Sequence, residues 1–243
     1  FVMNRSCLIL DERELAFSRE EERTLMGRLF MENEGNPLPL AEQALEQVCG
    51  GLCGWPAGVM LAGIYFKTKG VPSGKINWPC LVQASMIGGF LDCELFGELS
   101  EEEKEFLFRT ADMEELDEEI CDAVLGRDDS RGMIRNFLEK NIFCYSPEEG
   151  AGIRRHPIVE LYLKSFGNHR QAADTARRAA EYCLERRSFF KAARQAAGIG
   201  DTPLILTLLE QSGGDLLRGK QWETLAVCVR CPWEKFRTER WQA

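Results

Sequence analysis

The sequence predicts a mostly helical protein with one small β-hairpin in its middle. Apolar residues recur at helical spacing along most of its 243 residues. Two Ser-x-x-Glu capping boxes, at Ser18–Glu21 and Ser100–Glu103, mark helix starts. The hairpin is predicted by two short segments that read as strands, 142–145 and 152–155, on either side of a turn-like segment.

The first part of the chain reads as a helical subdomain. A short β-like stretch and a linker precede Ser18, and the helix that it starts is broken at Gly35-Asn36-Pro37. A second amphipathic helix is expected over 40–48. Pro56 is well placed for the first turn of a third helix, where its missing N–H is no loss. Residues 70–79, with two prolines and two glycines, read as a loop.

The middle part has the element order of a winged helix. Three helices are expected, and Asp129 or Ser130 is positioned to cap the third. The hairpin follows, and Pro157 starts another helix. Four side chains of that helix are expected to face inward: Ile158, Leu161, Tyr162 and Phe166.

From His169 onward the chain is expected to be entirely helical, with His169 itself on the surface. Amphipathic segments at 172–186, 189–197, 203–211 and 221–229 are separated by short breaks. Such pairing is typical of a helical repeat array. An array of this kind exposes an apolar end unless another unit covers it, so we expect the chain to be the central part of a longer protein.

Composition and charge argue against several classes of protein. The net charge of −9 argues against a broad nucleic-acid-binding surface. The longest apolar run, 52–66, has 15 residues, whereas a membrane span needs roughly 20. The ten cysteines include several inside apolar helical patterns, where cysteine acts as a small hydrophobe. With no signal peptide at Phe1, we expect a reduced, cytoplasmic protein that does not enter membranes.

Charge is distributed unevenly along the chain. Residues 98–145 contain 15 acids and 6 bases, which argues against DNA binding through the helix over 131–140. The acidic run from Glu114 to Glu119 is most simply a solvated face. From residue 167 the balance reverses, with 13 bases and 9 acids. These bases either dock the acidic winged helix or hold an anionic ligand, and the sequence does not choose.

Several motifs, in this order, resemble regulators of the LuxR family of the MalT type, which are STAND ATPases. The resemblance rests on segments spread over nearly the whole chain: Glu14–Glu21, Gly54-Trp55-Pro56-Ala57-Gly58, Phe106–Thr110, Cys121–Gly126, His156–Leu163 and Ala179–Tyr182. Each segment is weak alone, but the ordered set is specific.

The resemblance implies a domain plan and a nucleotide site. Residues 1–17 would end a nucleotide-binding domain, 18–97 form a helical lid, 98–167 a winged helix, and 168–243 the first TPR-like repeats of a sensor domain. The GxP motif, with Gly54 and Pro56, would place the proline ring against adenine. By the same resemblance, His156 would contact the β-phosphate of ADP, so that exchange for ATP opens the protein.

The resemblance also says what this chain should lack. The phosphate loop Gly-x-x-x-x-Gly-Lys-[Ser/Thr] is absent from the sequence, and in the family it lies upstream. The chain alone should therefore bind no ATP or ADP and have no catalytic residues. Expected partners are the upstream nucleotide-binding domain, a downstream helix-turn-helix domain that carries the DNA contact, and an unidentified inducer or regulatory protein.

Other interpretations remain open at this point. The sequence is also consistent with a helical scaffold for protein–protein interaction without nucleotide control, and with a winged-helix DNA binder. Pro56 is also explained as a plain helix-starting proline, and His156 as a strand-end histidine that the backbone satisfies. The Cys228-x-x-Cys231 pair lacks the second pair that a closed zinc site needs, so no metal is expected.

Overall fold

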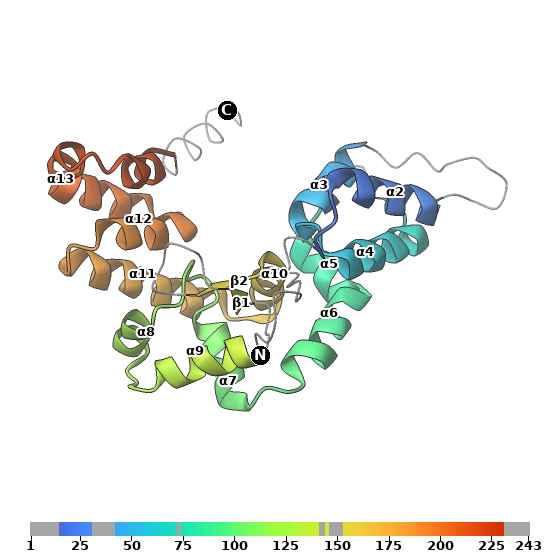
Figure 1. Ribbon diagram of the computed structural model, residues 1–243, viewed down its shortest axis with the longest axis horizontal. Helices are drawn as coiled ribbons and strands as arrows, with labels where there is room; N and C mark the ends of the chain where they lie inside the picture. Colours follow the sequence, from blue (N-terminus) through green and yellow to red (C-terminus); the bar gives the residue numbers. More distant parts are fainter. Residues whose placement is uncertain (1–14, 31–41, 72–73, 141–143, 146–152, 231–243) are drawn as a thin grey trace, which may run out of the picture. The chain divides into compact units, whose positions relative to one another are not determined.

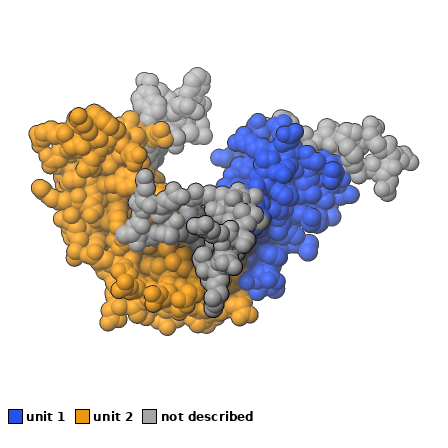
Figure 2. Space-filling model, viewed as in Figure 1, with its two compact units in different colours: residues 1–94 blue, residues 95–243 orange. Residues whose placement is uncertain are grey.

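The computed structural model describes residues 15–30, 42–71, 74–140, 144–145 and 153–230. The described chain is mostly helical, as predicted (Figure 1). It divides into two compact units, residues 1–94 and 95–243, which are coloured separately in Figure 2. Each unit is described by itself below. Within the described ranges, no helix is long and apolar enough to cross a membrane.

Unit 1 is a small helical bundle. Its helices are α2 (Arg19–Phe30), α3 (Glu42–Leu52), α4 (Pro56–Lys69), α5 (Trp78–Ala84) and α6 (Met86–Leu91), and the π-helical turn η1 (Asp92–Phe96) follows. The predicted capping box starts α2. The Ser18 N–H donates to Glu21 Oε2 at 2.8 Å, and the Glu21 N–H donates to Ser18 Oγ at 3.3 Å.

Helix α4 is the centre of unit 1 and packs against α2, α3 and α6. Helix α4 is apolar nearly all round, so the side that faces away from the core also carries apolar residues. Val59, Ala62 and Phe66 are buried, whereas Met60 and Ile64 are exposed. The core around it is completed by side chains from every other helix of the unit: Met26, Val48, Leu52, Leu81, Val82, Ile87 and Leu91.

Unit 2 begins with the predicted winged helix. Its elements are α7 (Glu101–Arg109), α8 (Glu118–Leu125), α9 (Ser130–Glu139), β1 (Cys144–Tyr145), β2 (Arg154–Arg155) and α10 (Pro157–Phe166). The two strands pair antiparallel, with Cys144 opposite Arg155. An additional bridge joins Ile153 to Leu116. The turn predicted between the strands lies outside the described residues.

The caps of the winged helix are partly those predicted. Ser100 and Glu103 form the expected capping box at α7. Asp129, one of the two residues predicted to cap α9, is its N-cap residue, but its side chain makes no capping hydrogen bond. The carboxylate of Asp129 is engaged by Arg127 instead, at 2.5 and 2.8 Å. The start of α9 is bound by Asp122 instead, whose Oδ1 accepts the Ser130 N–H at 3.0 Å.

Aromatic rings fill the core of the winged helix. Phe106 and Phe137 are buried with ring centroids 5.7 Å apart, and Phe96 stacks on Tyr162 at 4.3 Å. Phe166 was predicted to face inward but is 46% exposed. As the last residue of α10, it reaches the edge of the core and lies against Tyr162 at 4.8 Å.

The chain continues as stacked helices. These are α11 (His169–Glu185), α12 (Phe189–Gly198), α13 (Thr202–Arg218) and a helix over 222–230. Helix α11 packs on α12 and α12 packs on α13, as the predicted pairing requires. Alanines dominate the buried faces of α11 and α12: Ala172, Ala176, Ala179, Ala180, Ala192, Ala193 and Ala196. His169 is exposed, as expected. A TPR-like character of these helices stays a prediction.

The winged helix docks on this helix pair through the acidic segment, defined here as residues 114–119. Asp117 Oδ2 lies 2.6 Å from Lys191 Nζ, and Glu119 Oε1 lies 2.6 Å from Arg186 Nη1. Glu114 pairs with Arg194. The expectation of a solvated face was therefore wrong for Asp117, which is buried, and partly wrong for Glu114, which is half-buried, whereas Glu119 is exposed as expected. Of the two roles considered for the basic helices, docking is the one that Arg186, Lys191 and Arg194 perform.

A buried glutamine fixes the register of this docking. Gln195 is only 2% exposed. Its Oε1 accepts the Glu114 N–H at 3.1 Å, and its Nε2 donates to the Glu115 carbonyl at 3.3 Å. One side chain of α12 thus satisfies both a backbone donor and a backbone acceptor of the acidic segment, as a neighbouring strand would.

Asp117 should contribute stability that depends on its charge. Burial would raise the pKa of Asp117, but Lys191 and the N–H groups of Ile120 and Glu119 outweigh burial and hold the pKa below its usual value. We expect Asp117→Asn, which keeps an N-cap, to lower the free energy of unfolding by about 1–2 kcal/mol at pH 7. Urea titrations would measure this loss.

Two further measurements make this test specific. Because the folded pKa is depressed, the contribution of Asp117 is present above the unfolded pKa of about 3.9 and vanishes as the pH falls through the folded pKa. Glu139→Gln breaks an exposed ion pair, with Arg135 at 3.9 Å, and should cost less than about 0.5 kcal/mol. Equal losses in the two variants would contradict the assignment.

Candidate functional site

The turn between α3 and α4 is built around Gly54. Its backbone has φ +78°, in the left-handed region that favours glycine. The Gly54 N–H donates to Glu22 Oε1 at 3.1 Å, and its carbonyl accepts the Phe17 N–H at 2.8 Å. Glu22 is only 1% exposed. The turn therefore ties together the segment before α2, α2 itself and the start of α4.

No other residue type fits at Gly54. A Cβ there would lie 2.7 Å from the Phe17 carbonyl oxygen, on top of the unfavourable φ. The nearby Cys49 is no candidate nucleophile, because burial and a hydrogen bond with Glu22 raise the pKa of its thiol to about 12. The family resemblance placed Gly54 in a nucleotide site, whereas its observed contacts are with the Phe17 backbone and with Glu22.

Pro56 is the first residue of α4, as predicted, and its ring is half-buried. The neighbouring Trp55 explains the rest of the motif. A Cβ on Gly58 would lie 2.1 Å from the Trp55 ring, so this glycine makes room for the indole. Trp55 also contacts Phe90, with centroids 5.6 Å apart. Gly54, Gly58 and Trp55 thus shape a turn that presents the Pro56 ring at a helix start.

His156 is the N-cap of α10. Its Nδ1 accepts the Ile158 N–H at 3.2 Å, and Pro157 occupies the first helical position. Burial lowers the pKa of His156. An imidazole whose Nδ1 accepts a hydrogen bond is neutral and carries its proton on Nε2. His156 is therefore a neutral hydrogen-bond donor through Nε2–H, fixed by the helix that it caps.

Arg155, directly before His156, is a structural residue for which the sequence predicted no role. It is 2% exposed. Its Nη2 donates to the carbonyls of Thr110 at 3.0 Å and Ala111 at 3.2 Å, and also to that of Met113. The usable signal was strand alternation, because Arg155 follows Ile153 by two residues and shares its inward face.

The predicted site residues fall in different units. Gly54 and Pro56 belong to unit 1, where one turn brings them together, and His156 belongs to unit 2. In the part of the chain that the structure describes, no three His, Cys, Asp or Glu side chains gather as metal ligands do. Cys228 is fully buried, and Cys231 lies outside the described residues.

Comparisons with known proteins agree with this architecture. Residues 92–175 match the MalT winged helix domain, a range that encloses the predicted winged helix at 98–167. The HTH-type transcriptional regulator MalT of Vibrio cholerae is 28% identical over 142 residues, which are 56% of this chain. That of Vibrio campbellii is 24% identical over 181 residues, which are 72% of this chain.

These matches confirm the resemblance to MalT-type regulators and show that the middle of the chain is a winged helix. The chain spans only 16% and 20% of the length of these two relatives. The four-domain division, the nucleotide contacts and the absence of catalysis stay predictions.

Gly54 should be far less replaceable than a helical glycine of the same unit. We expect Gly54→Ala to lower the free energy of unfolding by about 2 kcal/mol or more, because of its positive φ and the contact with Phe17. Gly27 in α2 has open space around a Cβ, so Gly27→Ala should be neutral or stabilise by up to about 1 kcal/mol. Thermal unfolding would compare them; a harmless Gly54→Ala would refute the role.

The imidazole of His156 should titrate below the ordinary value of 6.5. Nitrogen-detected NMR is expected to show a protonated Nε2 and an unprotonated Nδ1 at pH 7. Since the folded pKa is lowered, this group's stabilisation is complete above about pH 6.5 and is lost as the pH falls. A proton on Nδ1, or a midpoint above 6.5, would contradict the capping geometry.

Proposed function

We propose that this chain is the nucleotide-sensing part of a MalT-type transcription activator, and that its state follows the exchange of ADP for ATP. The observation that supports this most is the neutral His156 donor at the start of α10, inside the matched winged helix. Bound ADP would stabilise a closed resting state. ATP and an inducer would shift the population toward an open, active state.

His156 has the chemistry for a phosphate contact. Its Nε2–H donates without carrying a charge, so the contact does not depend on protonation above the imidazole pKa. The imidazole also sits at the N-terminus of a ten-residue helix, where the helix dipole favours a negative group. Both properties suit the β-phosphate of ADP, which the family resemblance assigns to this histidine.

Pro56 has the chemistry for a contact with adenine. Its half-buried ring is rigid, apolar and supported by the turn around Gly54. A base stacks on such a surface without displacing a hydrogen-bonded side chain. In this proposal, Gly54 acts through its backbone and shapes the turn that holds Pro56.

The remaining parts of the activity belong to a longer protein in this proposal. A nucleotide-binding domain upstream would hold the phosphate loop and hydrolyse ATP, and a helix-turn-helix domain downstream would bind DNA. This chain then needs no catalytic residue of its own. It would relay the nucleotide state from the winged helix to the helices that follow it.

Direct DNA binding by this winged helix is disfavoured by its ion pairs. Each of the six bases in 98–145 has a carboxylate within 4.0 Å. The pairs are Lys104–Glu101, Arg109–Glu105, Arg127–Glu102, Arg131–Glu118, Arg135–Glu139 and Lys140–Glu103. A phosphate backbone would have to compete with these partners in a region of net charge −9.

A scaffold for protein–protein interaction is the second candidate. The helices after α12 expose several large apolar side chains: Leu206, Leu217, Trp222 and Val229. Exposed apolar groups of this size are typical of contact surfaces. A scaffold of this kind would keep the helical stack and need no nucleotide.

The test is ADP binding by calorimetry, on the protein that the complete gene encodes. We expect His156→Asn to weaken ADP binding roughly tenfold, because asparagine keeps the helix cap but its amide is too short to replace Nε2–H. His169→Asn is the matched control, since His169 is the second of the two histidines and is exposed.

The outcomes separate the two functions. Tight binding that His156→Asn weakens and His169→Asn leaves unchanged supports the switch. Tight binding that neither variant changes removes His156 from the nucleotide contact. A folded protein that binds no ADP, encoded by a gene without a phosphate loop, would contradict the switch and leave the scaffold.

A further inference from the structure

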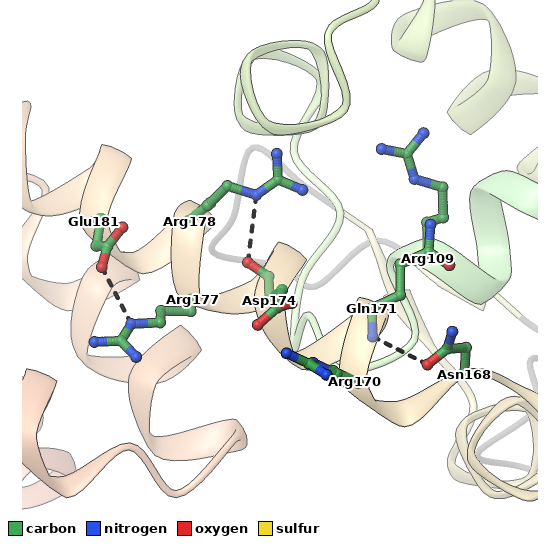
Figure 3. A pocket seen from close by; sticks show the side chains of 8 residues that line it. All are labelled: Arg109, Asn168, Arg170, Gln171, Asp174, Arg177, Arg178 and Glu181. Carbon is green, nitrogen blue, oxygen red and sulfur yellow. Dashed lines mark hydrogen bonds and ion pairs between the residues drawn. The ribbon is translucent and has the colours of Figure 1, made fainter.

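A groove of about 710 Å³ lies along the first half of α11, where the end of α7 approaches it. Arginines from both helices line this arginine groove: Arg109 from α7, and Arg170, Arg177 and Arg178 from α11 (Figure 3). The lining holds two carboxylates, those of Asp174 and Glu181. Its volume is that of a small-molecule site.

Only one of the four arginines is well neutralised. Arg177 Nε lies 3.2 Å from Glu181 and 3.6 Å from Asp201. By contrast, Arg178 donates to the backbone carbonyl of Asp174 at 3.4 Å, not to its carboxylate. Among the described residues, neither Arg170 nor Arg178 has a carboxylate within ion-pair distance.

Arg109 adds a buried donor to the groove. Its Nε is shielded from solvent and makes no hydrogen bond within the described chain. The nearest ion-pair partner is Glu105, at 3.7 Å and itself 67% exposed. The Arg109 side chain as a whole is 27% exposed and lines the groove, so its positive charge adds to the attraction of an anion there.

Arg170 and Arg178 differ in their ion pairing from several other arginines of unit 2. Several arginines of the unit are held closely by carboxylates, such as Arg127 by Asp129 at 2.5 Å and Arg186 by Glu119 at 2.6 Å. The docking ion pairs therefore neutralise only part of the excess positive charge from residue 167 onward. Arg170 and Arg178 carry part of this excess into the groove.

We propose that the arginine groove binds a small molecule through a phosphate or diphosphate group. Guanidinium groups match phosphate oxygens with paired, charge-assisted hydrogen bonds. A long nucleic acid is a poorer fit, because Asp174 and Glu181 interrupt the groove and the adjoining winged helix is acidic. The site lies apart from His156 and is independent of the nucleotide switch proposed above.

The probe is inorganic pyrophosphate, titrated into this chain by calorimetry in metal-free buffer at low salt. Arg170→Gln and Arg178→Gln should each weaken binding roughly tenfold, since each removes a charged donor from an exposed position where folding is not at risk. Arg135→Gln is the control: this arginine is 77% exposed on α9, away from the groove.

Binding that both groove variants weaken, and that Arg135→Gln changes by less than about twofold, supports the site. Equal weakening by Arg135→Gln means diffuse attraction and overturns it. No pyrophosphate binding by the folded chain overturns it as well. Retention of a DNA duplex through Arg170 and Arg178, without pyrophosphate binding, would replace the small ligand by a nucleic acid.

Discussion

The docking of the acidic segment onto α11 and α12 is the interaction on which the arrangement of unit 2 depends. Residues 114–119 are held from two sides. Gln195 and Lys191 hold them from α12, while Arg155 of β2 holds the carbonyls of the preceding turn. A single short stretch of chain therefore positions both the wing strand and the first helical pair. Loss of one partner would leave a buried charge or backbone group unsatisfied.

The contacts that hold this part of unit 2 also fix the position of His156, the proposed nucleotide contact. Arg155 directly precedes His156, so the interactions that anchor β2 also set where the imidazole lies. The cap on α10 then fixes the tautomer, and burial keeps the ring neutral. In unit 1 the turn at Gly54 plays the equivalent structural part for Pro56. Each proposed nucleotide contact thus has its own rigid support.

Local features were predictable from the sequence, and long-range ones were not. The capping boxes at Ser18 and Ser100, and the helix starts at Pro56 and Pro157, depend on residues within one helical turn. Asp129 is the N-cap residue of α9, but it makes no side-chain cap bond because Arg127 binds its carboxylate. Arg155 and Gln195 find their partners more than 40 residues away, at positions that no local pattern identifies. The roles of Pro56 and His156 came from the family resemblance, and Gly54 shows that a motif residue can be required by the fold alone.

The docking contacts imply that the winged helix and the α11–α12 pair form one cooperative body. Native-state hydrogen exchange, followed residue by residue in denaturant, tests it directly. We predict that the amides of α8, α11 and α12 open together, with one free energy and one dependence on denaturant. Opening of α11 and α12 at a clearly lower free energy, while α8 stays protected, would contradict the claim.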